Sequence, residues 1–189
     1  PKGVRVAAVA NFPEGGLDLQ PALRDIETIA QAGGDEIDVV LPWKALMAGQ
    51  VQEVAEFLAE VRHASRPLTL KVIIESGELK DEALIRRATQ LALNAGADFV
   101  KTSTGKTPVS ATPAAAKAML AEIKAAGLSS AGFKASGGIR SVAQAAEYLQ
   151  LAADAGLEPK RVRFGASGLL DDILNVLGGG DSQAKGTGY

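Results

Sequence analysis

A repeat of short apolar runs is the feature that most constrains the fold of this 189-residue chain. The runs are rich in Val, Ile, Leu or Phe, and their starting points lie 30 to 33 residues apart. They are VRVAAVA (4–10), EIDVVLP (36–42), LTLKVIIE (68–75), DFVKTS (98–103), AGFKAS (131–136) and RVRFGA (161–166). Segments with helical periodicity lie between them, and several of these end in glycine, as helices often do. Strands that alternate with helices so regularly predict a parallel sheet, either closed into a barrel or open and doubly wound.

Two helix starts are predicted from capping residues. Thr112 is followed by Pro113, which fits the first helical position because its missing N–H costs nothing there. Ser141 precedes another helical stretch and is a second expected N-cap.

The alternation of residues within the runs favours the barrel. In four of them a charged residue stands beside apolar neighbours: Asp38, Lys71, Lys101 and Lys134. Successive residues of a strand point to opposite faces, so the apolar neighbours would pack against helices and the charged residues would share the other face. In a barrel that face points inward. We therefore expect one acid and three amines to converge inside the sheet.

This convergence indicates chemistry more than stability, because burying ions costs several kcal/mol each and a buried pair is often no better than apolar packing. Neighbouring ammonium groups disfavour each other's charge, and desolvation acts in the same direction, so one lysine can become a neutral nucleophile. Such an amine forms an imine with a carbonyl substrate. A nearby carboxylate such as Asp38 can then move protons.

A phosphate site is predicted where the last two strands end, as in many barrel enzymes. SGGIR (136–140) follows one of these strands and GASG (165–168) follows the other. Glycines let the backbone approach an anion closely, the following helix ends supply N–H groups, and Arg140 adds charge. The segment STGKT (103–107) imitates the end of a Walker loop, but Val100 stands where that motif requires glycine. No G-x-G-x-x-G follows a strand, so a dinucleotide-binding fold lacks its main support.

Composition narrows the class of partner. The 20 basic and 22 acidic residues give a net charge of -2 without runs of like charge, so we expect neither nucleic acid nor a membrane as partner. There is no cysteine and one histidine, so metal catalysis is not expected. No other cofactor is predicted. No apolar run is long enough to span a bilayer and the start is unlike a signal peptide, which predicts a cytoplasmic protein.

Several long segments resemble the deoxyribose-phosphate aldolases, a family of class I (Schiff-base) aldolases. They are VKTSTGK, EIDVVLP, LKVIIESGELKDEALI, GFKASGGIR, RFGASGLL and the glycine-rich tail that ends in Tyr189. The resemblance runs through essentially the whole chain. It implies a TIM (β/α) barrel and the reversible cleavage of 2-deoxy-D-ribose 5-phosphate to acetaldehyde and D-glyceraldehyde 3-phosphate, within deoxyribonucleotide catabolism. The substrates would be small phosphorylated sugars and aldehydes, and a homo-oligomer is possible.

The resemblance also implies roles for individual residues. Lys101 would form the Schiff base, Lys134 would perturb its pKa, and Asp38 would relay protons with the help of Lys71. Tyr189, on a mobile tail, could reach in for proton transfer. The residues expected around the substrate phosphate are Gly105, Lys106, Gly137, Gly138, Arg140, Gly165 and Ser167.

Two departures from the family are visible. Gly168 stands where the family often has a second serine. Six βα units are present where a barrel has eight, and the family's first two strands have no counterpart before Val4. We therefore expect an incomplete, open barrel over residues 1–177, a flexible tail over 178–189, and exposed sheet edges that invite association. Two functional hypotheses remain open: an active phosphosugar aldolase, or an inactive, N-terminally truncated fragment that keeps the site residues.

Overall fold

The computed structural model describes residues 3–182, and six parallel strands form its single sheet. The strands follow one another in chain order, and each pairs with the next. They are β1 (Ala7–Ala10), β2 (Glu36–Val40), β3 (Thr69–Ile73), β4 (Phe99–Lys101), β5 (Gly132–Ser136) and β6 (Val162–Gly165). All six predicted strands are therefore present.

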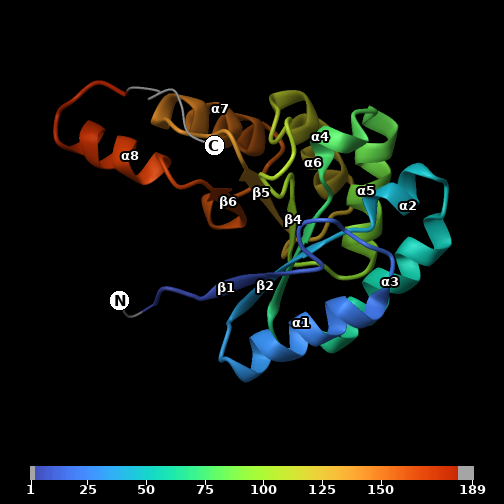
Figure 1. The fold of residues 1–189 in the computed structure, drawn as a ribbon. Coiled ribbons are helices and arrows are strands. Elements are labelled where there is room, and N and C mark those ends of the chain that lie inside the picture. Colours follow the sequence, from blue (N-terminus) through green and yellow to red (C-terminus); the bar gives the residue numbers. More distant parts are fainter. Residues whose placement is uncertain (1–2, 183–189) are drawn as a thin grey trace.

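Helices follow the strands, and those that connect one strand to the next cover one face of the sheet (Figure 1). They are α1 (Leu19–Gln31), α2 (Trp43–Met47), α3 (Val51–Ala64), α4 (Ser76–Leu79), α5 (Glu82–Asn94), α6 (Pro113–Ala125), α7 (Val142–Asp154) and α8 (Leu169–Leu177), with a short 3-10 helix at Pro159–Arg161. Both predicted N-caps are confirmed. The Thr112 side chain accepts a hydrogen bond from the N–H of Ala115, and Ser141 forms a capping box with Gln144.

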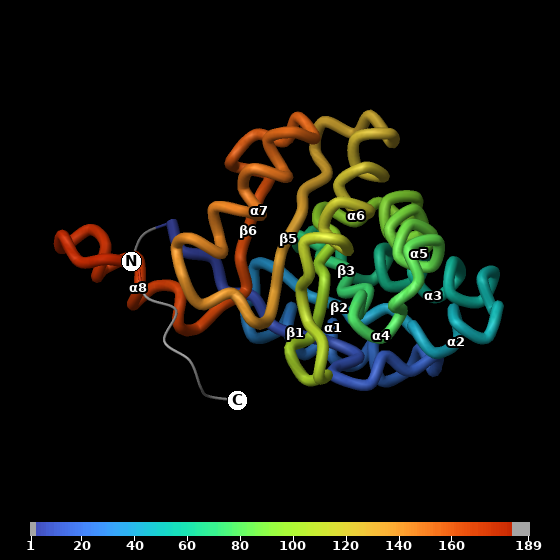
Figure 2. The backbone as a smooth tube through the Cα atoms, turned by 90° about the horizontal axis from the view of Figure 1, so that it is seen from above, coloured from blue at the N-terminus to red at the C-terminus, as the bar shows by residue number. Residues whose placement is uncertain are grey.

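The core lies between the outer face of the sheet and these helices. Ile37, Val39, Leu70, Val72 and Phe133 are fully buried there. Seen from above, the helices follow an outer arc around the curled strands (Figure 2). The residues of opposite parity line the inner face of the curled sheet, and they form the candidate site.

The predicted incomplete barrel is confirmed, because β1 and β6 are the two edges of a six-stranded open sheet. Apolar side chains are exposed near the first edge, at Val4, Val6 and Val9. In both views α8 lies on the side of the molecule where the chain begins (Figures 1 and 2). This helix exposes a second apolar face, formed by Leu170, Ile173, Leu174 and Leu177.

Part of the expected tail, including Tyr189, lies outside the described residues, so the proton-transfer role and the domain boundary at 177 stay predictions. No helix within residues 3–182 is both long and apolar enough to cross a membrane.

Candidate active site

Asp38 is the centre of the inner face. Its Oδ1 accepts a hydrogen bond from Lys71 Nζ at 2.7 Å, and its Oδ2 accepts from Lys101 Nζ and Lys134 Nζ at 2.8 Å each. The strand register explains this meeting, because Asp38 pairs with Lys71 and Lys101 pairs with Lys134 in the parallel ladder. The acid and three amines singled out by parity are thus brought together.

The pKa values in this cluster follow from burial and charge. Burial alone would raise the pKa of the Asp38 carboxyl, but the ammonium groups of Lys101 and Lys134 outweigh it and hold the pKa well below its ordinary value. Lys101 is 6% exposed, and this burial lowers its pKa despite the attraction of Asp38; the charges of Lys134 and Lys71 act in the same downward direction. Asp38 is therefore a carboxylate beside an amine that loses its proton more readily than a free lysine.

A second acidic residue, Glu36, lies two positions before Asp38 on β2. Glu36 is 1% exposed, and its Oε2 accepts from Lys71 Nζ at 2.6 Å and from Arg163 Nη1 at 2.5 Å. Burial would raise the pKa of Glu36, but hydrogen bonds from Arg163 and Lys71 lower it. Lys71 is thus shared between two carboxylates, which fixes the position of its ammonium group.

Neither Glu36 nor Arg163 was predicted from the sequence, although a signal was present. Glu36 stands two positions before Asp38 and so has the same parity. Arg163 pairs with Lys134 in the ladder between β5 and β6, and its guanidinium lies 4.6 Å from the centre of the Phe99 ring. Arg163 stands between Val162 and Phe164 in β6, so its parity matches that of Lys134.

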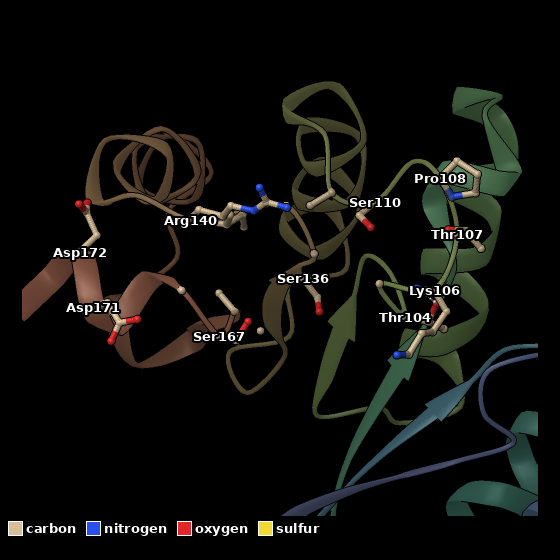
Figure 3. A pocket seen from close by; sticks show the side chains of 18 of the residues that line it. Thr104, Lys106, Thr107, Pro108, Ser110, Ser136, Arg140, Ser167, Asp171 and Asp172 are labelled. Carbon is tan, nitrogen blue, oxygen red and sulfur yellow. Dashed lines mark hydrogen bonds between the residues drawn. The ribbon is translucent and has the colours of Figure 1, made fainter. Parts of the chain in front are cut away.

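A cavity of about 1040 Å³ opens at the carboxyl ends of β4, β5 and β6. All seven residues predicted to surround a phosphate line it: Gly105, Lys106, Gly137, Gly138, Arg140, Gly165 and Ser167. Figure 3 shows Lys106 on one side of this cavity, Arg140 and Ser167 on the other, and Ser136 between them. Among the lining residues, Gly165 lies beside Lys134, because a Cβ on this glycine would lie 3.3 Å from Lys134 Cε.

The start of α7 differs from the expectation that its backbone N–H groups serve a phosphate. The N–H groups of Arg140 and Ser141 donate to Gln144 Oε1, and that of Val142 donates to Asp172 Oδ2 at 2.8 Å. These three N–H groups therefore donate to side chains of the protein itself, namely Gln144 of the capping box and Asp172 of α8. The α8 residues Asp171, Asp172 and Asn175, which were not predicted, also line the cavity.

The model of the DeoC/LacD family aldolases matches residues 2–174 of the chain. The chain belongs to this aldolase family. It is 49% identical to deoxyribose-phosphate aldolase of Agrobacterium fabrum over 191 residues, which cover 98% of this chain and 73% of the relative. The aldolase assignment fits a carboxylate and three amines gathered inside a barrel-like sheet.

Solved aldolase structures share the fold. The aldolase QR15 superposes with a TM-score of 0.79 and 28% identity, covering 94% of this chain and 76% of its own. The deoxyribose phosphate aldolase of Aeropyrum pernix, described as tetrameric, gives a TM-score of 0.73 and 27% identity, covering 92% of this chain and 70% of its own. Between residues 3 and 182 of this aldolase, no group of three or more His, Cys, Asp or Glu side chains is arranged to hold a metal ion.

Proposed function

We propose that the chain cleaves 2-deoxy-D-ribose 5-phosphate reversibly to acetaldehyde and D-glyceraldehyde 3-phosphate, through an imine on Lys101. One observation carries this proposal: the Lys101 amine is buried, donates to Asp38 Oδ2 at 2.8 Å and has a lowered pKa. The name of the Agrobacterium relative supports the substrate. Breakdown of deoxynucleosides in the cytoplasm is the setting that such a substrate fits.

Imine formation requires Lys101 as a neutral amine. Once neutral, Nζ attacks the aldehyde carbon C1, and loss of water from the carbinolamine leaves a protonated imine. Lys134 favours this step by disfavouring a second positive charge close to it. Lys71, anchored between Glu36 and Asp38, keeps the carboxylate in place.

Carbon–carbon cleavage uses the imine as an electron sink. The C3 hydroxyl loses its proton to a base, the C2–C3 bond breaks, and its electron pair moves toward the iminium nitrogen to form an enamine. The fragment of C3, C4 and C5 leaves as glyceraldehyde 3-phosphate, with C3 as its aldehyde carbon. Protonation of the enamine at C2 and hydrolysis of the resulting imine release acetaldehyde and restore Lys101. The carboxylate of Asp38, in contact with Lys101 and Lys134, is the group proposed to relay these protons.

Reductive trapping tests the proposal. Acetaldehyde with sodium borohydride should add one ethyl group to the intact chain, and peptide mapping should place it on Lys101. Lys101→Ala should abolish the adduct, whereas Lys117→Ala, an exposed lysine on α6, should keep it. An adduct that maps to Lys134, or survives in Lys101→Ala, would reverse the assigned roles. No adduct at all would support the alternative of an inactive chain.

A further inference from the structure

The loop of residues 102–112 joins β4 to α6 without regular secondary structure and carries Gly105 and Lys106 into the cavity wall. Close packing fixes its far half. A Cβ on Gly77 would lie 1.9 Å from the Val109 carbonyl oxygen, and one on Gly137 would lie 2.5 Å from the Ser110 side chain. The near half, where Gly105 and Lys106 stand, depends on hydrogen bonds.

Glu75, two residues after the end of β3 and immediately before α4, supplies those hydrogen bonds. It is fully buried, and its Oε2 accepts from the Thr104 hydroxyl at 2.5 Å. Its Oε1 accepts from the Thr104 N–H at 3.2 Å. The same Thr104 hydroxyl accepts from the N–H of Lys106 at 3.0 Å. A continuous series of contacts therefore runs from the Glu75 carboxylate to the backbone of Lys106.

The backbone of Glu75 adopts a conformation that is uncommon for a residue with a side chain. Its φ is +52°, in the left-handed region that favours glycine. Such a conformation is strained for a non-glycine residue, and strained residues cluster at functional sites. A buried carboxylate is also a poor choice for stability alone.

The chemistry of the contacts favours a carboxylate over an amide. The N–H and the hydroxyl of Thr104 both donate, and an ionised Glu75 offers only acceptors. A glutamine would turn an NH₂ group toward one of these donors and lose that contact. The loop position should therefore be sensitive to Glu75→Gln, although the two side chains have nearly the same size.

We propose that Glu75 is a positioning residue that holds Gly105 and Lys106 in the arrangement that receives the substrate phosphate. This inference rests on the proposed function. Glu75 acts through Thr104, so it should govern the binding of the phosphate group and leave imine formation on Lys101 untouched.

The test compares 2-deoxyribose 5-phosphate with 2-deoxyribose in kinetic assays of four variants. Glu75→Gln and Thr104→Val should raise KM for the phosphorylated sugar about tenfold, the scale of one lost hydrogen bond to a charged group. The unphosphorylated sugar should be little affected. Thr104→Ser keeps the hydroxyl and should keep the preference for phosphate. Glu78→Gln makes the same chemical change on α4 and serves as the matched control.

Hydrogen exchange at the amides of residues 104–106 provides a second readout. Glu75→Gln should accelerate exchange there, and an unchanged rate would overturn the proposal. Equal loss of kcat/KM on both sugars would also overturn it, since that indicates general damage. Failure of the proposed function has a different signature, namely no acetaldehyde trapping on Lys101 in the unsubstituted protein, and hydrogen exchange then still decides whether Glu75 holds the loop.

Discussion

Lys101 and Lys134 donate to the same oxygen of Asp38, each at 2.8 Å. Two ammonium groups that share one acceptor cannot both be well compensated. Lys101 is also desolvated, and the repulsion from Lys134 adds to this burial in lowering the pKa of Lys101. The three residues therefore form one electrostatic unit.

The pH dependence of imine formation should shift in opposite directions in two variants of this unit. Lys134→Met removes a cation that lowers the pKa of Lys101, so trapping of acetaldehyde should require a higher pH. Asp38→Asn removes an anion that raises this pKa, so trapping should extend to lower pH. The midpoint of cyanoborohydride trapping against pH measures both shifts. Lys117→Met, on the exposed side of α6, should shift neither way, and shifts of the same sign in the first two variants would contradict the coupling.

Arg140→Ala should narrow the preference for phosphorylated substrate. Loss of one charge-assisted contact corresponds to about 10–100-fold in kcat/KM on the phosphorylated sugar. The ratio of kcat/KM between 2-deoxyribose 5-phosphate and 2-deoxyribose is the measurement, and Arg87→Ala on the exposed side of α5 is its control. An unchanged ratio would place the phosphate elsewhere in the cavity.

The contact between Glu36 and Arg163 should contribute to folding stability. Arg163→Met should lower the free energy of unfolding by about 1–3 kcal/mol, less than the roughly 3–5 kcal/mol of a fully buried pair, because the Arg163 side chain is 36% exposed. Urea unfolding measures the change. In a double-mutant cycle with Glu36→Gln the combined loss should be smaller than the sum of the two single losses. Strict additivity would mean that the two side chains do not interact.

The exposed apolar face of α8 should drive self-association. Leu174 is 59% exposed and Leu177 is 78% exposed, and such faces associate in water. Light scattering should show a mass that rises with concentration, and Leu174→Glu should suppress the rise. Leu149→Glu, at an exposed leucine of α7 outside this face, is the control. A constant monomer mass over the whole concentration range would refute this expectation.

Residue parity was enough to predict the inner cluster, because a parallel ladder leaves each side chain only two faces. Asp38, Lys71, Lys101 and Lys134 meet as that rule requires. The rule also applies to Glu36 and Arg163, so their place could have been predicted from the sequence. The open edges followed from counting six units.

The loops were beyond such rules. Nothing in a local pattern indicates that Glu75 turns through a left-handed conformation, or that its carboxylate accepts from Thr104, 29 positions away. The engagement of the α7 start by Asp172 is a tertiary contact of the same kind. Loop contacts depend on how neighbouring strands and helices pack in three dimensions, and local sequence patterns do not specify this packing.

The hydrogen bond from Arg163 to Glu36 joins residues 127 positions apart. During synthesis Glu36 and Lys71 emerge early, whereas Arg163 arrives on the last strand. Contacts of such large sequence separation slow folding, because the ends of a long segment must meet before they stabilise anything. Until β6 joins the sheet, the buried carboxylate of Glu36 lacks its partner Arg163. The electrostatic balance of the inner cluster therefore depends on β6, and without this strand Lys71 and Lys101 would lie in a different electrostatic field.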